Sequence, residues 1–323
     1  MAKKDSSKEE GGLNFLSIGT RLLTKDVMDQ YIRTLGPHRT YYATGMVASR
    51  RVIAETVPDI ILMEFEYADG TAYRLLQEIR KNPLAASSFV ILAVDEDSLA
   101  LKNIAEEMDV DAILTKPFSA KNLEDQFLAY QKSVVDKTSV SSLVRQAERA
   151  FAEKAFSLAD KLFRLAIQTG GENARIMAKA GAYYAKVPDY TQAEKHLERA
   201  IKIDPQCVVA LNELGLLYLK KKEFHQAFDC LTKAQDLSPL NPERPKVMMK
   251  LHMMWASETL KSVLMTDPGN DLLKYELAKL SVFQKDYAAA IKLFQQIKFE
   301  ATDPLNDEVK KYTAFLTKLS ELR

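Results

Sequence analysis

Short apolar runs alternate with amphipathic stretches of helical length between residues 13 and 132. The apolar runs are LNFLSIG, YYATG, IILMEFE, FVILAVDE and AILTK, and the stretches between and after them are TKDVMDQYIRTLG, MVASRRVIAETV, TAYRLLQEIRKNP, SLALKNIAEEM and AKNLEDQFLAYQK. Five strand and helix units in this order predict a mostly parallel sheet with helices on both faces. Ligands of such sheets bind beyond the carboxyl ends of the strands, and Lys116 ends the fifth predicted strand there.

Beyond residue 132 this alternation stops, and a helical pattern repeats with an offset of 34 residues. The residues Ala180, Gly181, Ala182, Tyr183, Tyr184, Ala193, Ala200 and Pro205 correspond to Leu214, Gly215, Leu216, Leu217, Tyr218, Ala227, Ala234 and Pro239. One offset earlier, small residues recur at Ala147, Ala159 and Ala166. Small residues let two antiparallel helices approach closely, and a proline ends the second helix.

These patterns divide the chain into a sheet domain and a helical array. Residues 1–12 are charged and rich in serine and glycine, so we expect a disordered tail. We expect the sheet domain over 13–132, a linker over 133–139, helical repeats over 140–305 and a capping helix over 306–323. The repeats are regular over 140–241, irregular over 242–270 and resume over 271–305. Pro239 and Pro268 are only 29 residues apart, which predicts short or fused helices in the irregular part.

Both halves resemble known families. The residues Pro58 to Met63 before an acid, Asp69 and Gly70 before a helix, and Leu114 to Phe118 resemble the receiver domains of two-component response regulators. The 34-residue pattern is similar to tetratricopeptide repeats. The resemblance implies an α/β flavodoxin-like (CheY-like) domain at the N-terminus and an all-α tetratricopeptide-repeat solenoid at the C-terminus.

The receiver family implies roles for residues at the strand ends. In that family a lysine, usually in a cis Lys-Pro peptide, contacts a phosphoryl group on an aspartate, and an acid pair helps to hold Mg²⁺. In this chain the aspartate position falls on Glu64, and the acid pair falls on Ile18 and Gly19 or on Gly19 and Thr20. The family's hydroxyl residue at the end of strand four falls on Val94, so the chain retains only Lys116. The loop from Glu64 to Gly70 is also about two residues shorter than usual.

Without the acid pair, Glu64 and Lys116 balance each other one to one. Such a pair at about 4 Å gains roughly 4 kcal/mol before desolvation is subtracted, so we expect an ion pair and a domain frozen in one state. Two alternatives stay open. In the first, Glu64 is simply a solvated acid at a strand end. In the second, Glu66, which lies two residues further along on the same face, forms a weak cation site with Glu64 and with Asp95 or Asp69. We expect no cofactor and no metal.

In the repeat family the first helix of each repeat lines an inner groove. Carried over, this gives Arg175, Ala178, Ala182, Lys186, Val209, Asn212, Leu216 and Lys220. Arg175, Lys186 and Lys220, together with the amide of Asn212, suit an acidic or carboxylate-bearing segment of a protein partner. They do not match the full clamp pattern of the chaperone-binding members.

Composition narrows the function classes. The net charge is +1 although 28% of the residues are charged, so no overall field favours nucleic acid or an anionic membrane. Apolar runs such as Phe89 to Val94 are far too short to span a membrane. Cys207 and Cys230 cannot form a disulfide framework, and we expect a cytoplasmic protein. The sequence contains no phosphate-binding glycine loop and no zinc-ligand spacing.

We therefore expect a non-enzymatic bacterial signalling adaptor or scaffold. Its pseudo-receiver is not phosphorylated, and its repeats bind a protein or peptide partner. A dimer through the receiver face is compatible with this hypothesis. The alternative is a response regulator in a phosphorelay, in which phosphorylation controls a protein-binding output domain. A structural subunit of a larger assembly fits the sequence as well.

Overall fold

The chain forms two compact units in the computed structural model, Met1–Leu217 with Cys230–Asn241, and Tyr218–Asp229 with Pro242–Arg323. The described residues are 12–19, 29–32, 34, 38–67, 70–82, 85–86, 88–95, 98–135, 138–171, 173–187, 189–300 and 302–321. Of the expected N-terminal tail, only Gly12 belongs to the described residues. The first unit contains both the sheet domain and most of the regular repeats, so compactness does not divide the chain at the expected linker.

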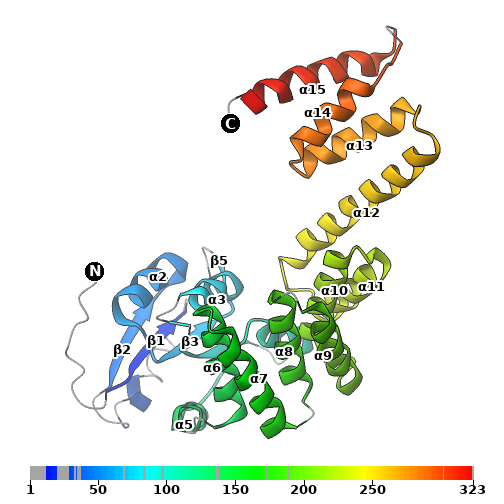
Figure 1. Cartoon of the computed structure of the whole chain (residues 1–323). Helices are drawn as coiled ribbons and strands as arrows, with labels where there is room; N and C mark the ends of the chain where they lie inside the picture. Colours follow the sequence, from blue (N-terminus) through cyan, green and yellow to red (C-terminus); the bar gives the residue numbers. More distant parts are fainter. Residues whose placement is uncertain are drawn as a thin grey trace. The chain divides into compact units, whose positions relative to one another are not determined.

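A five-stranded parallel sheet forms the core of the first unit (Figure 1). Its strands are β1 (Asn14–Ile18), β2 (Arg39–Ala43), β3 (Ile60–Glu64), β6 (Phe89–Val94) and β7 (Ala112–Thr115). Their spatial order is β2-β1-β3-β6-β7. This is the doubly wound flavodoxin-like order, in which the direction of winding changes between β1 and β3. The predicted α/β fold class is confirmed.

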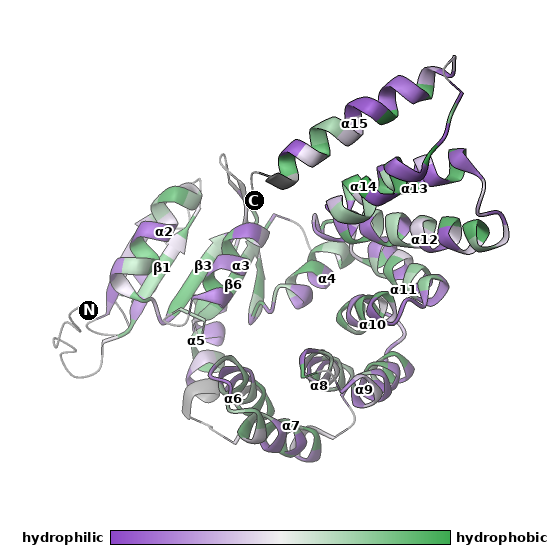
Figure 2. Cartoon of the chain, turned by 45° about the horizontal axis from the view of Figure 1, so that its top comes forward, coloured by the Kyte–Doolittle hydropathy of each residue, from purple (hydrophilic) through white to green (hydrophobic). Residues whose placement is uncertain are grey.

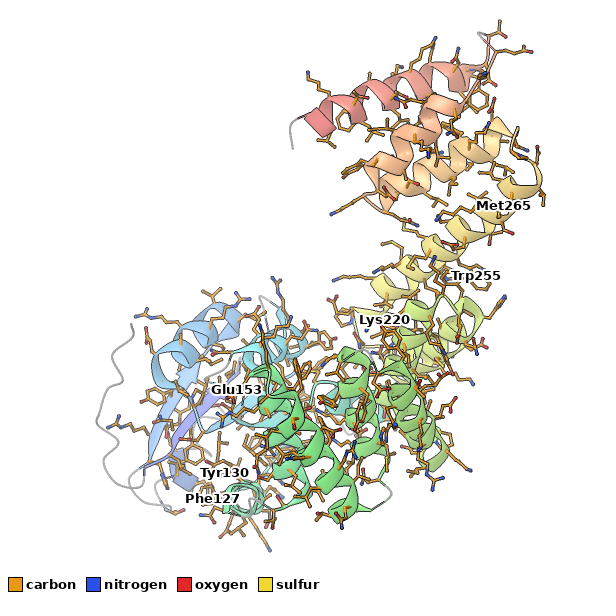
Figure 3. All side chains as sticks on the ribbon, viewed as in Figure 1. Phe127, Tyr130, Glu153, Lys220, Trp255 and Met265 are labelled. Atoms are coloured by element: carbon orange, nitrogen blue, oxygen red, sulfur yellow. The ribbon has the colours of Figure 1, made fainter. Side chains whose placement is uncertain are left out.

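Helices cover both faces of this sheet because successive strand residues point to opposite sides. One apolar core joins Leu16, Ile61 and Val90 to α2 (Gly45–Thr56), α3 (Ala72–Lys81) and α4 (Leu99–Glu107). The other core joins the alternate strand residues to α5 (Ala120–Val135). Phe127 and Tyr130, labelled in Figure 3, contribute the aromatic side chains of α5 to this second core.

Two features of this domain differ from the expected elements. A short antiparallel hairpin, β4 (Glu66–Tyr67) and β5 (Gly70–Thr71), follows β3, and the Ala72 amide closes it by donating to Phe65 O at 2.8 Å. Helix α5 continues to Val135, three residues into the expected linker. Of the first expected helix, residues 29–32 and 34 are helical, and the remainder lies outside the described residues.

The regular repeats are three antiparallel helix pairs. They are α6 (Val140–Ala152) and α7 (Phe156–Gly170), α8 (Ala174–Lys186) and α9 (Tyr190–Ile203), and α10 (Val208–Lys221) and α11 (Phe224–Leu237). The small residues picked out by the 34-residue offset, such as Ala159, Ala193 and Ala227, are fully buried. At Gly181 a Cβ atom would lie 2.5 Å from Leu197 Cγ, so α8 and α9 approach closely only because this position lacks a side chain.

The second unit continues with α12 (Arg244–Thr266), α13 (Asp271–Phe283), α14 (Tyr287–Gln296) and α15 (Pro304–Glu321). Helix α12 is a single helix of 23 residues where a repeat would have a helix pair. Trp255 packs against the His225 ring, with a centroid distance of 4.3 Å, whereas Met265 near the end of α12 is exposed (Figure 3). None of the described helices is long and apolar enough to cross a membrane.

We predict that Gly181→Val destabilises the second helix pair by about 1 to 3 kcal/mol, because the added methyl groups displace Leu197. Amide hydrogen exchange of α8 and α9 in the full chain measures this loss. The matched control is Gly269→Ala, whose Cβ would meet only Asp267 Oδ1 at 3.9 Å. The control should change local stability by less than about 0.5 kcal/mol. Unchanged exchange in Gly181→Val would contradict the close helix approach.

Candidate functional site

Four residues meet at the carboxyl ends of the central strands. The register pairs Ile18 with Met63 and Glu64 with Ala93, and Val94 with Thr115. Because the strands are parallel, the residues that follow them lie side by side at one edge of the sheet. Gly19, Glu64, Asp95 and Lys116 are therefore neighbours in space although they come from four different strand ends.

Lys116 bridges two carboxylates at this edge. Its Nζ lies 3.0 Å from Glu64 Oε1 and 3.0 Å from Asp95 Oδ1. The Glu64 side chain is only 7% exposed and that of Lys116 is 21% exposed, whereas the Asp95 side chain is 81% exposed. The expected partners Glu64 and Lys116 thus lie within ion-pair distance and away from bulk water. A fully solvated Glu64 does not fit this burial.

The backbone around Lys116 holds it in place. The Lys116 amide donates to Val94 O at 2.7 Å, and the peptide between Lys116 and Pro117 is cis, as the receiver resemblance implies. Burial alone would lower the pKa of the Lys116 ammonium, but hydrogen bonds to Asp95 and Glu64 outweigh it and raise that pKa above its ordinary value. Lys116 is therefore a permanent cation at neutral pH.

Gly19 shapes the space around Glu64. A Cβ atom on Gly19 would lie 2.9 Å from Glu64 Oε2 and 3.0 Å from its carboxyl carbon. The Glu64 carboxylate therefore packs directly on the Gly19 backbone, at a position where the receiver family has an acid. Val94, at the position of the family's hydroxyl residue, is 2% exposed and offers no polar atom from its side chain. Glu64 thus takes space that a metal-binding acid would need.

Of the remaining expected site residues, the structure describes only Glu66. Glu66 is exposed on β4, and Thr20 and Asp69 lie outside the described residues. Within the described ranges, no three side chains of His, Cys, Asp or Glu form a group that could hold a metal ion. The weak cation site considered from the sequence stays a prediction, because Asp69, one of its possible ligands, lies outside the described residues.

The structure places the expected groove residues in different surroundings. Ala178 is fully buried, and Ala182, Val209, Asn212 and Leu216 are half-buried. Lys186 and Lys220 are exposed, and Lys220 is labelled in Figure 3. Arg175 is half-exposed, and its Nη2 lies 2.9 Å from Asp109 Oδ1. An expected carboxylate-binding residue thus already binds a carboxylate of the same chain.

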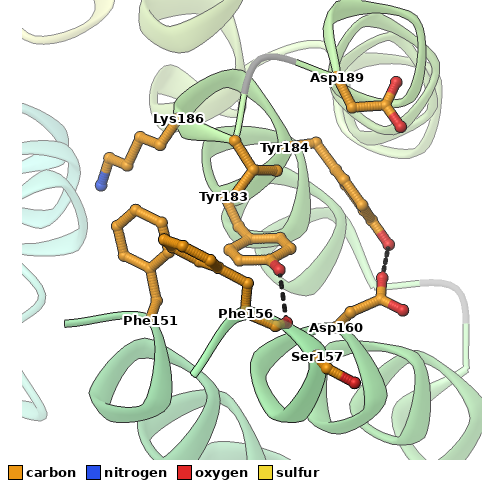
Figure 4. Close-up of a pocket in the computed structure, with 9 residues that line it drawn as sticks. Phe151, Phe156, Ser157, Asp160, Tyr183, Tyr184, Lys186 and Asp189 are labelled. Atoms are coloured by element: carbon orange, nitrogen blue, oxygen red, sulfur yellow. Dashed lines mark hydrogen bonds between the residues drawn. The ribbon is translucent and has the colours of Figure 1, made fainter. Parts of the chain in front are cut away.

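A pocket of about 560 Å³ opens beside Lys186 (Figure 4). It is lined by Phe151, Phe156, Ser157, Asp160, Tyr183, Tyr184, Lys186, Val187 and Asp189. The Lys186 ammonium lies 5.8 Å from the centre of the Phe151 ring. The Tyr184 hydroxyl donates to Asp160 Oδ1 at 2.6 Å. Burial and the neighbouring Asp160 carboxylate raise the pKa of Tyr184 to about 12. The pocket is therefore lined by both aromatic and charged side chains.

Further charged contacts link the α4–β7 turn to the repeats, and sequence reasoning missed them. Asp109 Oδ2 lies 3.1 Å from Lys179 Nζ, and Asp111 Oδ1 lies 2.8 Å from Arg145 Nη2. Glu107 Oε2 accepts from Ser238 Oγ at 2.9 Å and from Asn241 Nδ2 at 3.2 Å. We call this set the acidic clasp: Glu107, Asp109 and Asp111 on the receiver-like domain, with Arg145, Arg175, Lys179, Ser238 and Asn241 on the repeats. The acids in EEMDVDA and the expected carboxylate preference of Arg175 were its sequence signals.

We predict that Glu64→Gln lowers the free energy of unfolding of the sheet domain by about 1 to 3 kcal/mol. The amide leaves the half-buried Lys116 ammonium beside a neutral group, and a lost buried ionic partner is costly. Hydrogen exchange of the β3 amides in the full chain measures the change. The matched control is Asp95→Asn, which removes the exposed partner and should cost less than about 0.5 kcal/mol. An equally small cost for Glu64→Gln would show that the pair contributes nothing.

Comparison with known proteins supports the assignment of the helical part. The tetratricopeptide repeat family model matches residues 174–207 and 208–239. Tetratricopeptide repeat protein 5 of Bos taurus is 28% identical over 132 residues, which is 40% of this chain and 28% of that protein. RNA polymerase II-associated protein 3 of Homo sapiens is 28% identical over 127 residues, 36% of this chain and 19% of that protein. The chain thus spans less than a third of the length of these curated relatives.

Solved receiver structures are similar to part of the chain. The chemotaxis response regulator CheY4 of Vibrio cholerae aligns with 37% of this chain and 99% of its own length, at 12% identity and a TM-score of 0.35. A two-component response regulator from Legionella pneumophila covers 37% of this chain and 98% of its own length, at 12% identity and a TM-score of 0.34. By its own strand order and its repeat matches, the chain joins a CheY-like receiver fold to tetratricopeptide repeats.

Proposed function

We propose that this chain is a non-enzymatic signalling adaptor of the bacterial two-component type. Its receiver-like domain is a pseudo-receiver that carries no phosphoryl group, and its repeats bind a protein or peptide partner. The observation that carries this proposal is the Glu64 carboxylate, which lies against Gly19 and pairs with Lys116 at the strand ends.

The chemistry of phosphoryl transfer supports the first half of the proposal. A receiver centre crowds several carboxylates together, and a divalent cation and a lysine must neutralise them. Here the Lys116 ammonium is already neutralised by Glu64, and Gly19 supplies no carboxylate. Phosphorylation of Glu64 would have to break this pair and push a larger group against the Gly19 backbone. The geometry favours a domain held in one state by its own ion pair.

The repeats support the second half. Lys186 is exposed beside the aromatic pocket, so a partner segment could place an apolar side chain in the pocket and a carboxylate near the lysine. Inner-face residues such as Asn212 and Leu216 are half-buried and would add contacts along the groove. We place the adaptor in the cytoplasm, because its two cysteines, Cys207 and Cys230, form no disulfide with each other.

We predict that acetyl phosphate or beryllium fluoride with Mg²⁺ leaves the amide spectrum of the receiver-like domain unchanged in the full chain. The mass of the intact protein should also stay unchanged after incubation with acetyl phosphate. The Gly19→Asp and Glu64→Asp double variant serves as a control, because it restores two acids at the strand ends and removes the contact that Glu64 makes with Gly19. Saturable shifts at Glu64, or a mass increase of one phosphoryl group in the native chain, would favour the phosphorylation-responsive alternative.

A further inference from the structure

The acidic clasp shows that the inner side of the repeats can bind carboxylates, and that the chain supplies them itself. Arg175 and Lys179 of α8 bind the two carboxylate oxygens of Asp109, at 2.9 and 3.1 Å. Both residues project from the first helix of a repeat. Figure 2 shows α6 and α8 on the side of the repeats that faces the receiver-like domain, with α7 and α9 behind them.

We propose that the receiver segment from Glu107 to Asp111 is a ligand in cis for this face, and that an acidic segment of a partner protein binds Arg175 and Lys179 only by displacing it. This inference rests on the proposed function, because it specifies the partner class of the repeats. It adds that the receiver-like domain controls access to them. The receiver-like domain therefore contributes to partner binding through docking. The docking segment is well separated in sequence from Glu64.

The contacts of the clasp are polar, which favours reversible docking. The small apolar clusters around Leu143 and Val208 in the repeats share no residue with the two clusters of the sheet domain. The clasp consists of ion pairs and hydrogen bonds, and beside it Asn103 Nδ2 donates to Leu237 O at 2.7 Å. Polar contacts between domains of one chain permit relative motion more readily than large apolar ones.

Each side of the clasp keeps a partner when the two sides separate. Lys179 Nζ also lies 2.8 Å from Glu148 Oε1 on α6, within the repeats. Asp111 Oδ2 also accepts from Arg80 at 3.2 Å and from the Val90 amide at 2.8 Å, within the sheet domain. When the clasp opens, Lys179 and Asp111 therefore each keep one partner. The large cost of leaving a buried ion without a counterion does not arise for them. The arrangement suits a contact that opens and closes.

The backbone turn after α4 places the Asp109 side chain against the repeats. Met108 ends α4, and Asp109 follows in the left-handed region with φ of 58°, a conformation that aspartate tolerates better than most residues. Arg80 fixes this turn by donating to Asp109 O at 2.6 Å. Burial would raise the pKa of the Asp109 carboxyl, but Lys179, Arg80 and Arg175 together hold it well below its usual range. Asp109 thus carries a full negative charge at neutral pH.

The test opens the clasp from the receiver side, so that the basic face stays intact. We predict that Glu107→Lys with Asp109→Lys repels Arg175 and Lys179 and separates the two parts. Spin labels at Arg51→Cys on α2 and Lys161→Cys on α7, in a chain with Cys230→Ala, report the distance between them. The native chain should give one narrow distance distribution, and the reversed chain a broader and longer one. The matched control is Glu124→Lys with Asp125→Lys, which makes the same charge change on exposed residues of α5.

The same variants test access to the face. The probe is a fluorescent peptide with the sequence of residues 106–112, EEMDVDA, and its neutral counterpart is QQMNVNA. The acidic peptide should bind the reversed chain at least tenfold more tightly than the native chain or the control, and the gain should shrink with added salt. The neutral peptide should show no gain. Circular dichroism verifies folding, and the milder Glu107→Gln with Asp109→Asn should give an intermediate gain.

Two results would overturn the proposal. An unchanged distance distribution in both the reversed and the neutral variants would show that these acids do not hold the two parts together. A separated chain that binds the acidic peptide no better than the native chain would show that the face is not a carboxylate site. Neither result involves a phosphoryl donor, so a failure here is distinguishable from phosphorylation at Glu64, which would refute the pseudo-receiver itself.

Discussion

Lys116 and Glu64 form an ion pair at the carboxyl ends of the central strands, and the proposed pseudo-receiver depends on it. A single buried charge at that place would be costly, because neither water nor a counterion would compensate it. The pair removes this cost without a metal. Gly19 leaves the room for the Glu64 carboxylate. The strand-end site is therefore filled by the protein itself.

Carboxylates also form ion pairs at the turn between α4 and β7, but these pairs differ from the one at the strand ends. At the strand ends, the mostly buried Glu64 depends on Lys116. At the acidic clasp, Lys179 and Asp111 each have a second partner within their own part of the chain. Both carboxylates that Lys116 contacts, Glu64 and Asp95, lie at the same strand ends, so an exchange between them leaves the domain in one state. The charges of the clasp have partners on both of its sides, so they can exchange partners between the two sides. The proposed docking at the clasp depends on this second kind of arrangement.

The fold was predictable because its signals are periodic and local. Alternating apolar runs set the parallel sheet, and the 34-residue offset of small residues set the helix pairs. The irregular region was harder to predict. Pro245 lies in the first turn of α12, where a missing amide costs nothing, so the helix begins there and continues for 23 residues. The β4–β5 hairpin was also missed, since two-residue strands have no period to detect.

The strand-end residues were predictable because parallel topology brings successive strand ends together whatever their sequence separation. Sequence alone could not show that Glu64 packs on Gly19, since that contact depends on the rotamer of a long side chain. The clasp was out of reach for another reason. Asp109 and Arg175 are 66 residues apart and belong to different parts of the chain, and an acidic turn is usually a solvated one. The carboxylate preference of Arg175 was expected, but the origin of the carboxylate was not.

The most direct test of a filled strand-end site is to titrate the full chain with Mn²⁺, a paramagnetic substitute for Mg²⁺, and follow the amide line widths. Both ions prefer oxygen ligands in octahedral geometry, so Mn²⁺ would bind in any centre that accepts Mg²⁺. If Lys116 occupies the place of the cation, the amides of Gly19, Glu64 and Asp95 should broaden no more than that of the distant, exposed Lys195. Saturable broadening confined to those three amides would contradict a site closed by its own ion pair.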